Sequence, residues 1–131
     1  MVRSIIIPRR PPNAELDYKT LSTFPIPQSA IRNPKLSSLS LLKITLLTGR
    51  THQIRVQAAA KRHFVAGDRV YGNFPLNRLL RQTMGVRRLC LHASSLQFLH
   101  PITRQPLVLE ARLPDDMNDV LARLLEGAKK T

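Results

Sequence analysis

The sequence predicts a single α+β domain with a mixed, mainly antiparallel sheet and two or three helices. Two patterns predict this class. In some stretches apolar side chains alternate with polar ones, as strands over a core require, and in others they recur every three or four residues, as helices require. With 131 residues, of which 43% are hydrophobic, the chain is long enough for one core and too short for two ordinary domains.

The N-terminal third alternates proline-rich segments with strand-like ones. Residues 1–13 are basic and contain three prolines, so we expect an extended arm rather than a packed element. Residues 14–24 and 39–47 alternate apolar and polar side chains and predict two strands. Between them, residues 25–38 hold three more prolines, which predicts a loop long enough to contact a ligand.

Residues 46–57, LLTGRTHQIRVQ, lead from the second strand into a helix that is expected to run to about Arg62. Gly49 offers the backbone freedom for a sharp turn, and Thr51 is expected to cap the helix. A helix start presents free N–H groups and a positive dipole end, which favour a bound anion. Four polar or basic side chains lie beside this helix start: Arg50, His52, Gln53 and Arg55. The segment therefore predicts a site for a phosphate or a carboxylate.

The remainder of the chain predicts turns, a hairpin and one or two further helices. Turn chemistry recurs at Gly67-Asp68 and Gly72-Asn73, and His100 is expected to cap a hairpin turn. The expected elements are a short helix over 76–84 within the basic segment 74–88, strands at 89–100 and 106–113 around a loop at 101–105, a helix over 115–127 that Gly127 ends, and a basic tail at 128–131. The domain then spans residues 14–127.

The formal charge of +13, from 21 Lys and Arg against 8 Asp and Glu, predicts a polyanionic partner, with RNA or DNA as the leading candidate. Between Tyr18 and Leu109 the only acid is Asp68. The alternatives are a merely solvated basic surface or the tail of a larger assembly. The best candidates for phosphate contacts are two basic pairs: Lys61 and Arg62, and Arg87 and Arg88.

Other site classes are disfavoured. Cys90 lies in an apolar run and is interpreted as a small buried residue in a reducing compartment rather than a nucleophile. The four histidines and the single cysteine have no metal-ligand spacing, so we expect no metal. No apolar stretch has the length of a membrane span, which predicts a soluble, intracellular protein of the cytoplasm or the mitochondrion.

Four separate segments resemble the C-terminal half of the catalytic domain of RluA-type RNA pseudouridine synthases: GRTHQIRV at 49–56, GDRVYG at 67–72, LHASSLQFLHPIT at 91–103 and LPDDM at 113–117. The resemblance implies half of that domain's fold. It also implies isomerisation of uridine to pseudouridine in rRNA or tRNA, with no cofactor and no metal. In that reaction the bond from C1' to N1 breaks, the base turns, and it rejoins the ribose through C5.

The resemblance also implies roles for individual residues. Arg55 corresponds to the arginine that pairs with the family's catalytic aspartate, and Leu91 to an apolar residue beneath the uracil ring. Arg50, His52 and Gln53 would shape the floor of the pocket or contact the RNA backbone. These assignments agree with the chemistry, because a guanidinium favours the ionised form of a neighbouring carboxyl group and can hold it in a fixed fork.

The chain departs from the family because the segments that hold its catalytic aspartate and its active-site tyrosine are both absent. The family's catalytic aspartate lies in an HRLD-type segment, and no such segment occurs here. Asp17 and Tyr18 match a later strand of the family, and Asp68 is better explained as a residue that satisfies turn backbone groups. Arg55 would therefore lack its carboxylate, and half a sheet would leave an open strand edge, so we expect another protein chain or RNA to cover both.

Two hypotheses follow from this departure. In the first, the chain is the C-terminal part of a pseudouridine synthase, inactive by itself, whose aspartate lies on another chain. In the second, it is a non-catalytic RNA-binding component of a ribosome or of a ribosome-assembly complex. The intact GRTHQIR segment favours the first, and the basic, proline-rich arm together with the charge of +13 favours the second.

Overall fold

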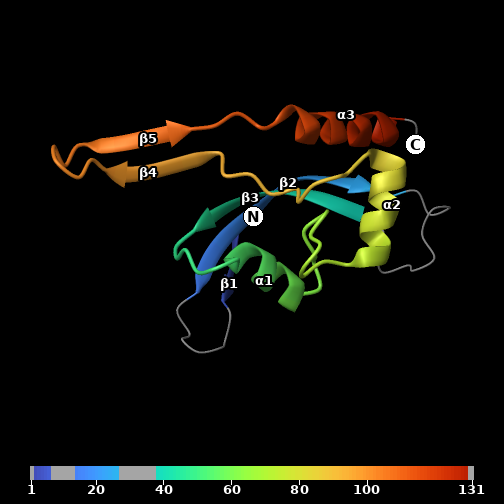
Figure 1. Cartoon of the computed structure of the whole chain (residues 1–131), viewed down its shortest axis with the longest axis horizontal. Coiled ribbons are helices and arrows are strands. Elements are labelled where there is room, and N and C mark those ends of the chain that lie inside the picture. The colour runs from blue at the N-terminus through green and yellow to red at the C-terminus, as the bar shows by residue number, and fades with distance from the viewer. Residues whose placement is uncertain (1, 7–13, 27–37, 130–131) are drawn as a thin grey trace.

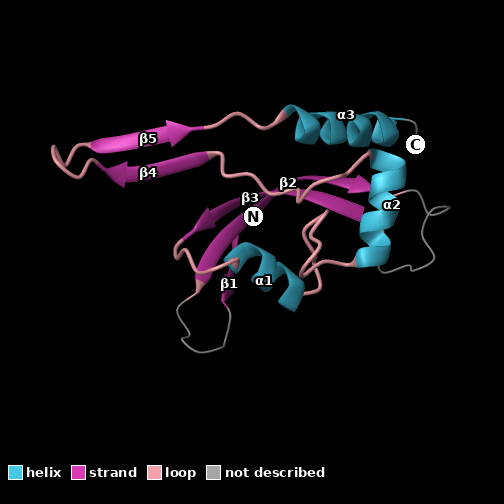
Figure 2. Ribbon diagram, in the orientation of Figure 1, coloured by secondary structure: helices cyan, strands magenta, loops and turns pink. Residues whose placement is uncertain are grey.

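The computed structural model describes residues 2–6, 14–26 and 38–129, which form three helices and two small antiparallel sheets (Figure 1). The strands are β1 (Val2–Ile6), β2 (Glu15–Pro25), β3 (Ser38–Leu46), β4 (Ser95–Leu99) and β5 (Pro106–Glu110). The helices are α1 (Gln53–Ala60), α2 (Phe74–Met84) and α3 (Asp115–Lys129). Figure 2 shows the same view coloured by secondary structure, with helices, strands and loops distinguished. The predicted α+β class is confirmed, and every described strand pair is antiparallel.

The larger sheet has the strand order β1-β2-β3. Leu16 of β2 faces Leu46 of β3, and the pairing continues past an irregularity after Thr20 to the far end of both strands. The expectation that the arm is not packed is wrong for residues 2–6, because they pair with β2 as β1. Residues 7–13 and most of the expected 25–38 loop lie outside the described residues. Within the described sheet, β3 has a neighbour on one side only.

The core lies where α2 and the segment after it meet the end of β2. Ile26, Leu76, Leu80 and Val86 form its buried cluster. The Asn73 side chain caps α2 by accepting a hydrogen bond from Leu76 N, and Gly85 ends the helix with a φ of 70°. The predicted helix over 76–84 is thus confirmed and begins slightly earlier. These contacts fix the turn that precedes α2.

Helix α3 packs against α2 and β2 and buries Leu124. It continues to Lys129, so the expectation that Gly127 ends it is wrong. No neighbouring atom lies near the position of a Cβ at Gly127, and glycine is tolerated in a helix at a modest cost in stability. None of the described helices is both long and apolar enough to cross a membrane.

Strands β4 and β5 form a hairpin that extends away from the larger sheet (Figure 1). Both strands are shorter than the expected 89–100 and 106–113. The turn matches its prediction, because His100 Nδ1 accepts hydrogen bonds from Ile102 N and Thr103 N. One face of the hairpin is wholly apolar, with Leu96 opposite Leu109 and Phe98 opposite Leu107. Three of these four side chains are at least 40% exposed.

Candidate functional site

The start of α1 differs from the expected turn. The helix begins at Gln53, and its cap residue is His52, whose φ of 49° is left-handed and whose side chain makes no capping bond. Thr51 therefore does not cap the helix. Gly49 does not adopt a positive φ, and no atom would crowd a side chain there, so the turn does not require glycine at this position.

Gln53 fastens the first turn of α1 to the sheet. Its Nε2 donates to Glu15 O at 3.0 Å and to Gln57 Oε1 at 3.3 Å. Its Oε1 accepts from Thr48 Oγ1 at 2.7 Å and from Arg50 N at 3.1 Å. The side chain is buried and uses its amide fully. An RNA contact by Gln53 stays a prediction, and such a contact would have to displace one of these four bonds.

Arg55 lies on α1 and pairs with Asp68. Arg55 Nε donates to Asp68 Oδ2 at 2.9 Å, and Nη2 donates to Oδ1 at 2.8 Å. The Arg55 side chain is 15% exposed and that of Asp68 only 1%. The expectation that Arg55 lacks a carboxylate within this chain is therefore wrong, because Asp68 pairs with it, and the covering of Arg55 by another chain or RNA stays a prediction. Two hydrogen bonds to an ionised acid form the strong, directional kind of ion pair.

The pair changes the acidity of both groups. The hydrogen bonds from Arg55, with two from backbone N–H groups, hold the pKa of the Asp68 carboxyl well below its usual range, although burial acts in the opposite direction. The Asp68 carboxylate raises the pKa of the Arg55 guanidinium. Asp68 is therefore ionised at every physiological pH.

Tyr71 covers one face of the Arg55 guanidinium, with Cζ 5.1 Å from the ring centroid, within the range of a cation–π contact. The Tyr71 hydroxyl lies 3.1 Å from His52 Nδ1, and the two rings meet edge to face. His52 thus contacts the residue that covers Arg55, and its role in RNA binding stays a prediction. His92 Nε2 lies 2.9 Å from Ala111 O and links the two segments that flank the hairpin.

The turn that carries Asp68 is fixed by its own backbone N–H groups, by Asn77 and by the backbone of Arg88. Asp68 Oδ1 accepts from Val70 N at 2.9 Å and Tyr71 N at 3.0 Å, as the turn assignment predicted. Asn77 of α2 donates to Asp68 O at 2.8 Å and accepts from Gly67 N at 3.0 Å. Gly67 has a φ of 79°, and a Cβ there would collide with the carbonyl of Arg88. This position therefore requires glycine.

Leu91 lies in an irregular segment beside this turn. The backbone N–H of its neighbour Cys90 donates to the carbonyl oxygen of Ala66, the residue before Gly67, at 2.8 Å. The Leu91 side chain is partly buried. The structure thus brings the LHA segment to the turn that holds Asp68. Burial raises the pKa of the Cys90 thiol, which agrees with its interpretation as a structural residue.

The basic candidates are distributed around this centre. Arg50 is exposed before α1, and Lys61 and Arg62 are exposed at the opposite end of that helix. Arg87 and Arg88 are exposed next to the Gly67 turn, and Arg88 Nη1 lies 3.6 Å from Asp116 Oδ1 in a solvent-exposed pair. Exposed pairs of this kind contribute little to stability, so a phosphate can replace Asp116 at small cost.

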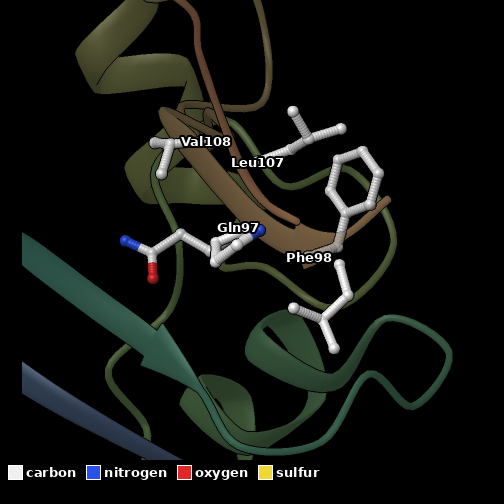
Figure 3. Close-up of a pocket in the computed structure, with 6 residues that line it drawn as sticks. Gln97, Phe98, Leu107 and Val108 are labelled. Atoms are coloured by element: carbon white, nitrogen blue, oxygen red, sulfur yellow. The ribbon is translucent and has the colours of Figure 1, made fainter. Parts of the chain in front are cut away.

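No group of three metal-ligating side chains occurs among the described residues. One hollow is lined by residues of the β4–β5 hairpin, Arg55 not among them, and Figure 3 shows Phe98, Leu107 and Val108 on its lining. The role of Asp68 beside Arg55 is the functional feature that sequence reasoning missed. The available signal was that Asp68 is the sole acid between Tyr18 and Leu109.

No family model matches the chain, but curated relatives do. The chain is 36% identical over 106 residues to tRNA pseudouridine synthase C of Vibrio parahaemolyticus, which covers 81% of the chain and 43% of that protein. It is 35% identical over 115 residues to tRNA pseudouridine synthase C of Salmonella typhi, covering 88% of the chain and 44% of that protein. Over 93 residues it is 43% identical to ribosomal large subunit pseudouridine synthase D of Xylella fastidiosa, covering 66% and 28%.

These matches span less than half the length of each relative, as a C-terminal half of the domain would. Together with the four segments that point to the same family, they assign this chain to the RluA-type pseudouridine synthases.

Proposed function

We propose that the chain binds RNA and supplies Arg55 to a pseudouridine synthase site whose catalytic carboxylate comes from the part of the domain that the chain does not cover. The substrate is a uridine in tRNA or rRNA, the classes named for its relatives. The observation that carries the proposal is the fixed, partly exposed guanidinium of Arg55. It fits a site that must keep a nearby carboxylate ionised.

The chemistry needs such a group. Isomerisation of uridine proceeds with an ionised carboxylate beside the ribose and base, and a neighbouring guanidinium lowers the pKa of that carboxyl group and fixes its orientation. A partly buried Leu91 supplies an apolar surface on which a uracil ring can rest. The chain has no HRLD-type segment, so the proposal assigns no turnover to the chain alone.

The basic side chains provide the affinity for RNA. The proposed phosphate contacts are Arg50, Lys61, Arg62, Arg87 and Arg88, with His52 near the base. Contacts to phosphates carry no sequence information and release counterions, so binding should weaken steeply with salt. Both the cytoplasm and the mitochondrion contain RNA of these classes, and the proposal fits either compartment.

The partner that completes the site is proposed to be a polypeptide. Within the part of the chain that the structure describes, one edge of β3 has no neighbouring strand, and the Leu96–Leu109 and Phe98–Leu107 pairs offer an apolar face. A single base can rest on one apolar side chain, but the surface of RNA is dominated by charged phosphates, which suit a face of four apolar side chains poorly. A second copy would bring another +13 charge into contact. A polypeptide with an apolar face and an acidic margin fits both features, and the remainder of the relatives' domain is the natural source.

Complementation tests this function. The chain would be mixed with the separately expressed N-terminal part of a tRNA pseudouridine synthase C relative, and pseudouridine in tRNA and rRNA transcripts would be measured by mass spectrometry. Turnover is expected only from the mixture. Turnover by the chain alone would contradict the proposal, and RNA binding with no turnover from any mixture would favour the ribosome-assembly role instead.

One pair of variants tests the docking face. Phe98→Asp places a charge on the apolar face and should abolish turnover of the mixture without changing RNA affinity. Ile102→Asp places the same charge at the hairpin turn, where the side chain is 85% exposed, and should leave turnover unchanged. Equal turnover by both variants would exclude the hairpin as the docking surface.

A further inference from the structure

The guanidinium of Arg55 is occupied on one edge and open on the other. Nε and Nη2 both donate to Asp68, and no hydrogen bond within the described residues involves Nη1. A guanidinium carries five N–H donors in a rigid fork, of which this pair uses two. The Nη1–Nη2 edge therefore retains donors for a second anionic group, and the side chain as a whole is 15% exposed.

Asp68 is a structural part of its turn, in addition to being the carboxylate that pairs with Arg55. Its carboxylate is 1% exposed, and Oδ1 accepts bonds from Val70 N and Tyr71 N in addition to the one from Arg55. Asn77 joins the same turn to α2 through two hydrogen bonds. To release Arg55, this carboxylate would have to leave a turn that the rest of the fold holds in place.

A third contact fixes the plane of the guanidinium. The Tyr71 ring lies against one face of Arg55, and the hydroxyl of Tyr71 meets His52 at the start of the same helix. Groups of this chain thus hold one edge and one face of the planar guanidinium. The orientation of its remaining edge, formed by Nη1 and Nη2, is thereby fixed.

We infer that Asp68 is a positioning residue, which holds the Nε edge of Arg55 so that the Nη edge is presented to a second carboxylate or to a phosphate. Arg55 then bridges two anions, one structural and one functional. The identity of the second anion rests on the proposed function, in which it is the catalytic carboxylate. The way in which Asp68 holds Arg55 does not rest on it.

The alternative is that Asp68 serves its turn alone. Asp68→Asn separates the two roles, because asparagine keeps one oxygen for Val70 N and Tyr71 N and replaces the other with a donor that repels Arg55. Asp119→Asn is the matched control, since it removes the same charge from an exposed position on α3.

The first measurement uses the isolated chain and needs no turnover. In NMR spectra, the Arg55 Nε–H, assigned from its absence in Arg55→Lys, should exchange with water about tenfold or more slowly than that of exposed Arg112. Asp68→Asn should remove this protection and Asp119→Asn should keep it. Equal exchange of Arg55 and Arg112 in the unmodified chain would overturn the inference, even if Asp68→Asn did not fold.

The second measurement uses the complemented enzyme. Asp68→Asn should lower kcat by about ten- to a hundredfold through misorientation of Arg55, while KM for RNA stays within about twofold. A kcat equal to that of Asp119→Asn would overturn the positioning role. If no mixture turns over, the proposed function fails, and the NMR comparison still decides whether Asp68 holds Arg55.

Discussion

Replacing Gln53 by alanine should loosen the start of α1 from the sheet, because its amide group bonds both Glu15 of β2 and Thr48, which follows β3. The change removes two bonds donated by Nε2 and two accepted by Oε1. Glu15 O keeps its bonds from Leu47 N and Thr48 N. Arg50 N loses its bond to the amide, and Thr48 Oγ1 loses its closest acceptor.

The magnitude follows from these bonds. A hydrogen bond in a folded protein contributes about 0.5–1.5 kcal/mol net. Of the four residues that lose a bond, Arg50 is exposed and Glu15 and Thr48 are partly buried, so water can replace part of the loss. We therefore expect the free energy of unfolding to fall by about 2–4 kcal/mol, a large share of the total of about 5–15 kcal/mol that is usual for a domain. Alanine itself suits a helix, so the loss does not come from helix propensity.

Urea unfolding followed by circular dichroism measures the change, with Gln82→Ala as the control. Gln82 is exposed on α2, and its replacement should alter the free energy of unfolding by less than about 0.5 kcal/mol. If Gln53→Ala is equally mild, the amide network does not hold α1 to the sheet, and the reasoning that connects Gln53 to the placement of Arg55 is wrong.

Three other predictions concern acid stability, the Gly67 turn and RNA affinity. Because folding lowers the pKa of Asp68, the ionised carboxylate stabilises the fold fully above about pH 4, and this stabilisation is lost as the pH falls further. Acid should therefore destabilise the unmodified chain more than it destabilises the Asp68→Asn variant. Urea titrations at successive pH values measure the difference. Gly67→Ala should lower stability by more than about 1 kcal/mol, whereas Gly127→Ala in open helix should leave it equal or higher, and a reversed order of thermal midpoints would contradict the turn assignment. Replacing Lys61 and Arg62 with glutamine should weaken RNA binding and reduce the slope of log affinity against log salt by about 2, and an unchanged slope would remove both from the contact surface.

The elements that local pattern defines could be predicted from the sequence. Alternation identified β2 and β3, and a short helix was expected over 76–84, within the range of α2. The strand β1 could not be predicted, because its formation depends on pairing with β2, from Ile6 opposite Glu15 to Val2 opposite Lys19, and the composition around it is that of a loop. Long-range pairing of this kind leaves little trace in a local window.

The candidate site could be predicted only in part, because its central contact also joins residues that are far apart in the sequence. Arg55 was identified, together with its need for an acid, but nothing in the spacing of 13 residues connects it to Asp68. The turn role of Asp68 is correct and incomplete, since one carboxylate serves both the turn and the guanidinium. Gly49 and Thr51 had the right residue types for a turn and a cap, yet the backbone placed the left-handed residue at His52.

The internal pair of Arg55 and Asp68 separates the folding of this chain from the proposed completion of the site. A partly buried guanidinium without a partner would oppose folding in a chain that already carries a charge of +13. Because Asp68 compensates that charge, the chain can order Arg55 before any other carboxylate or RNA arrives. A group ordered in advance loses little conformational entropy on binding, so completing the site costs less than building it on contact. Under the proposed function, a chain that covers under half of its relatives' length can therefore hold its own part of the site, Arg55, already ordered.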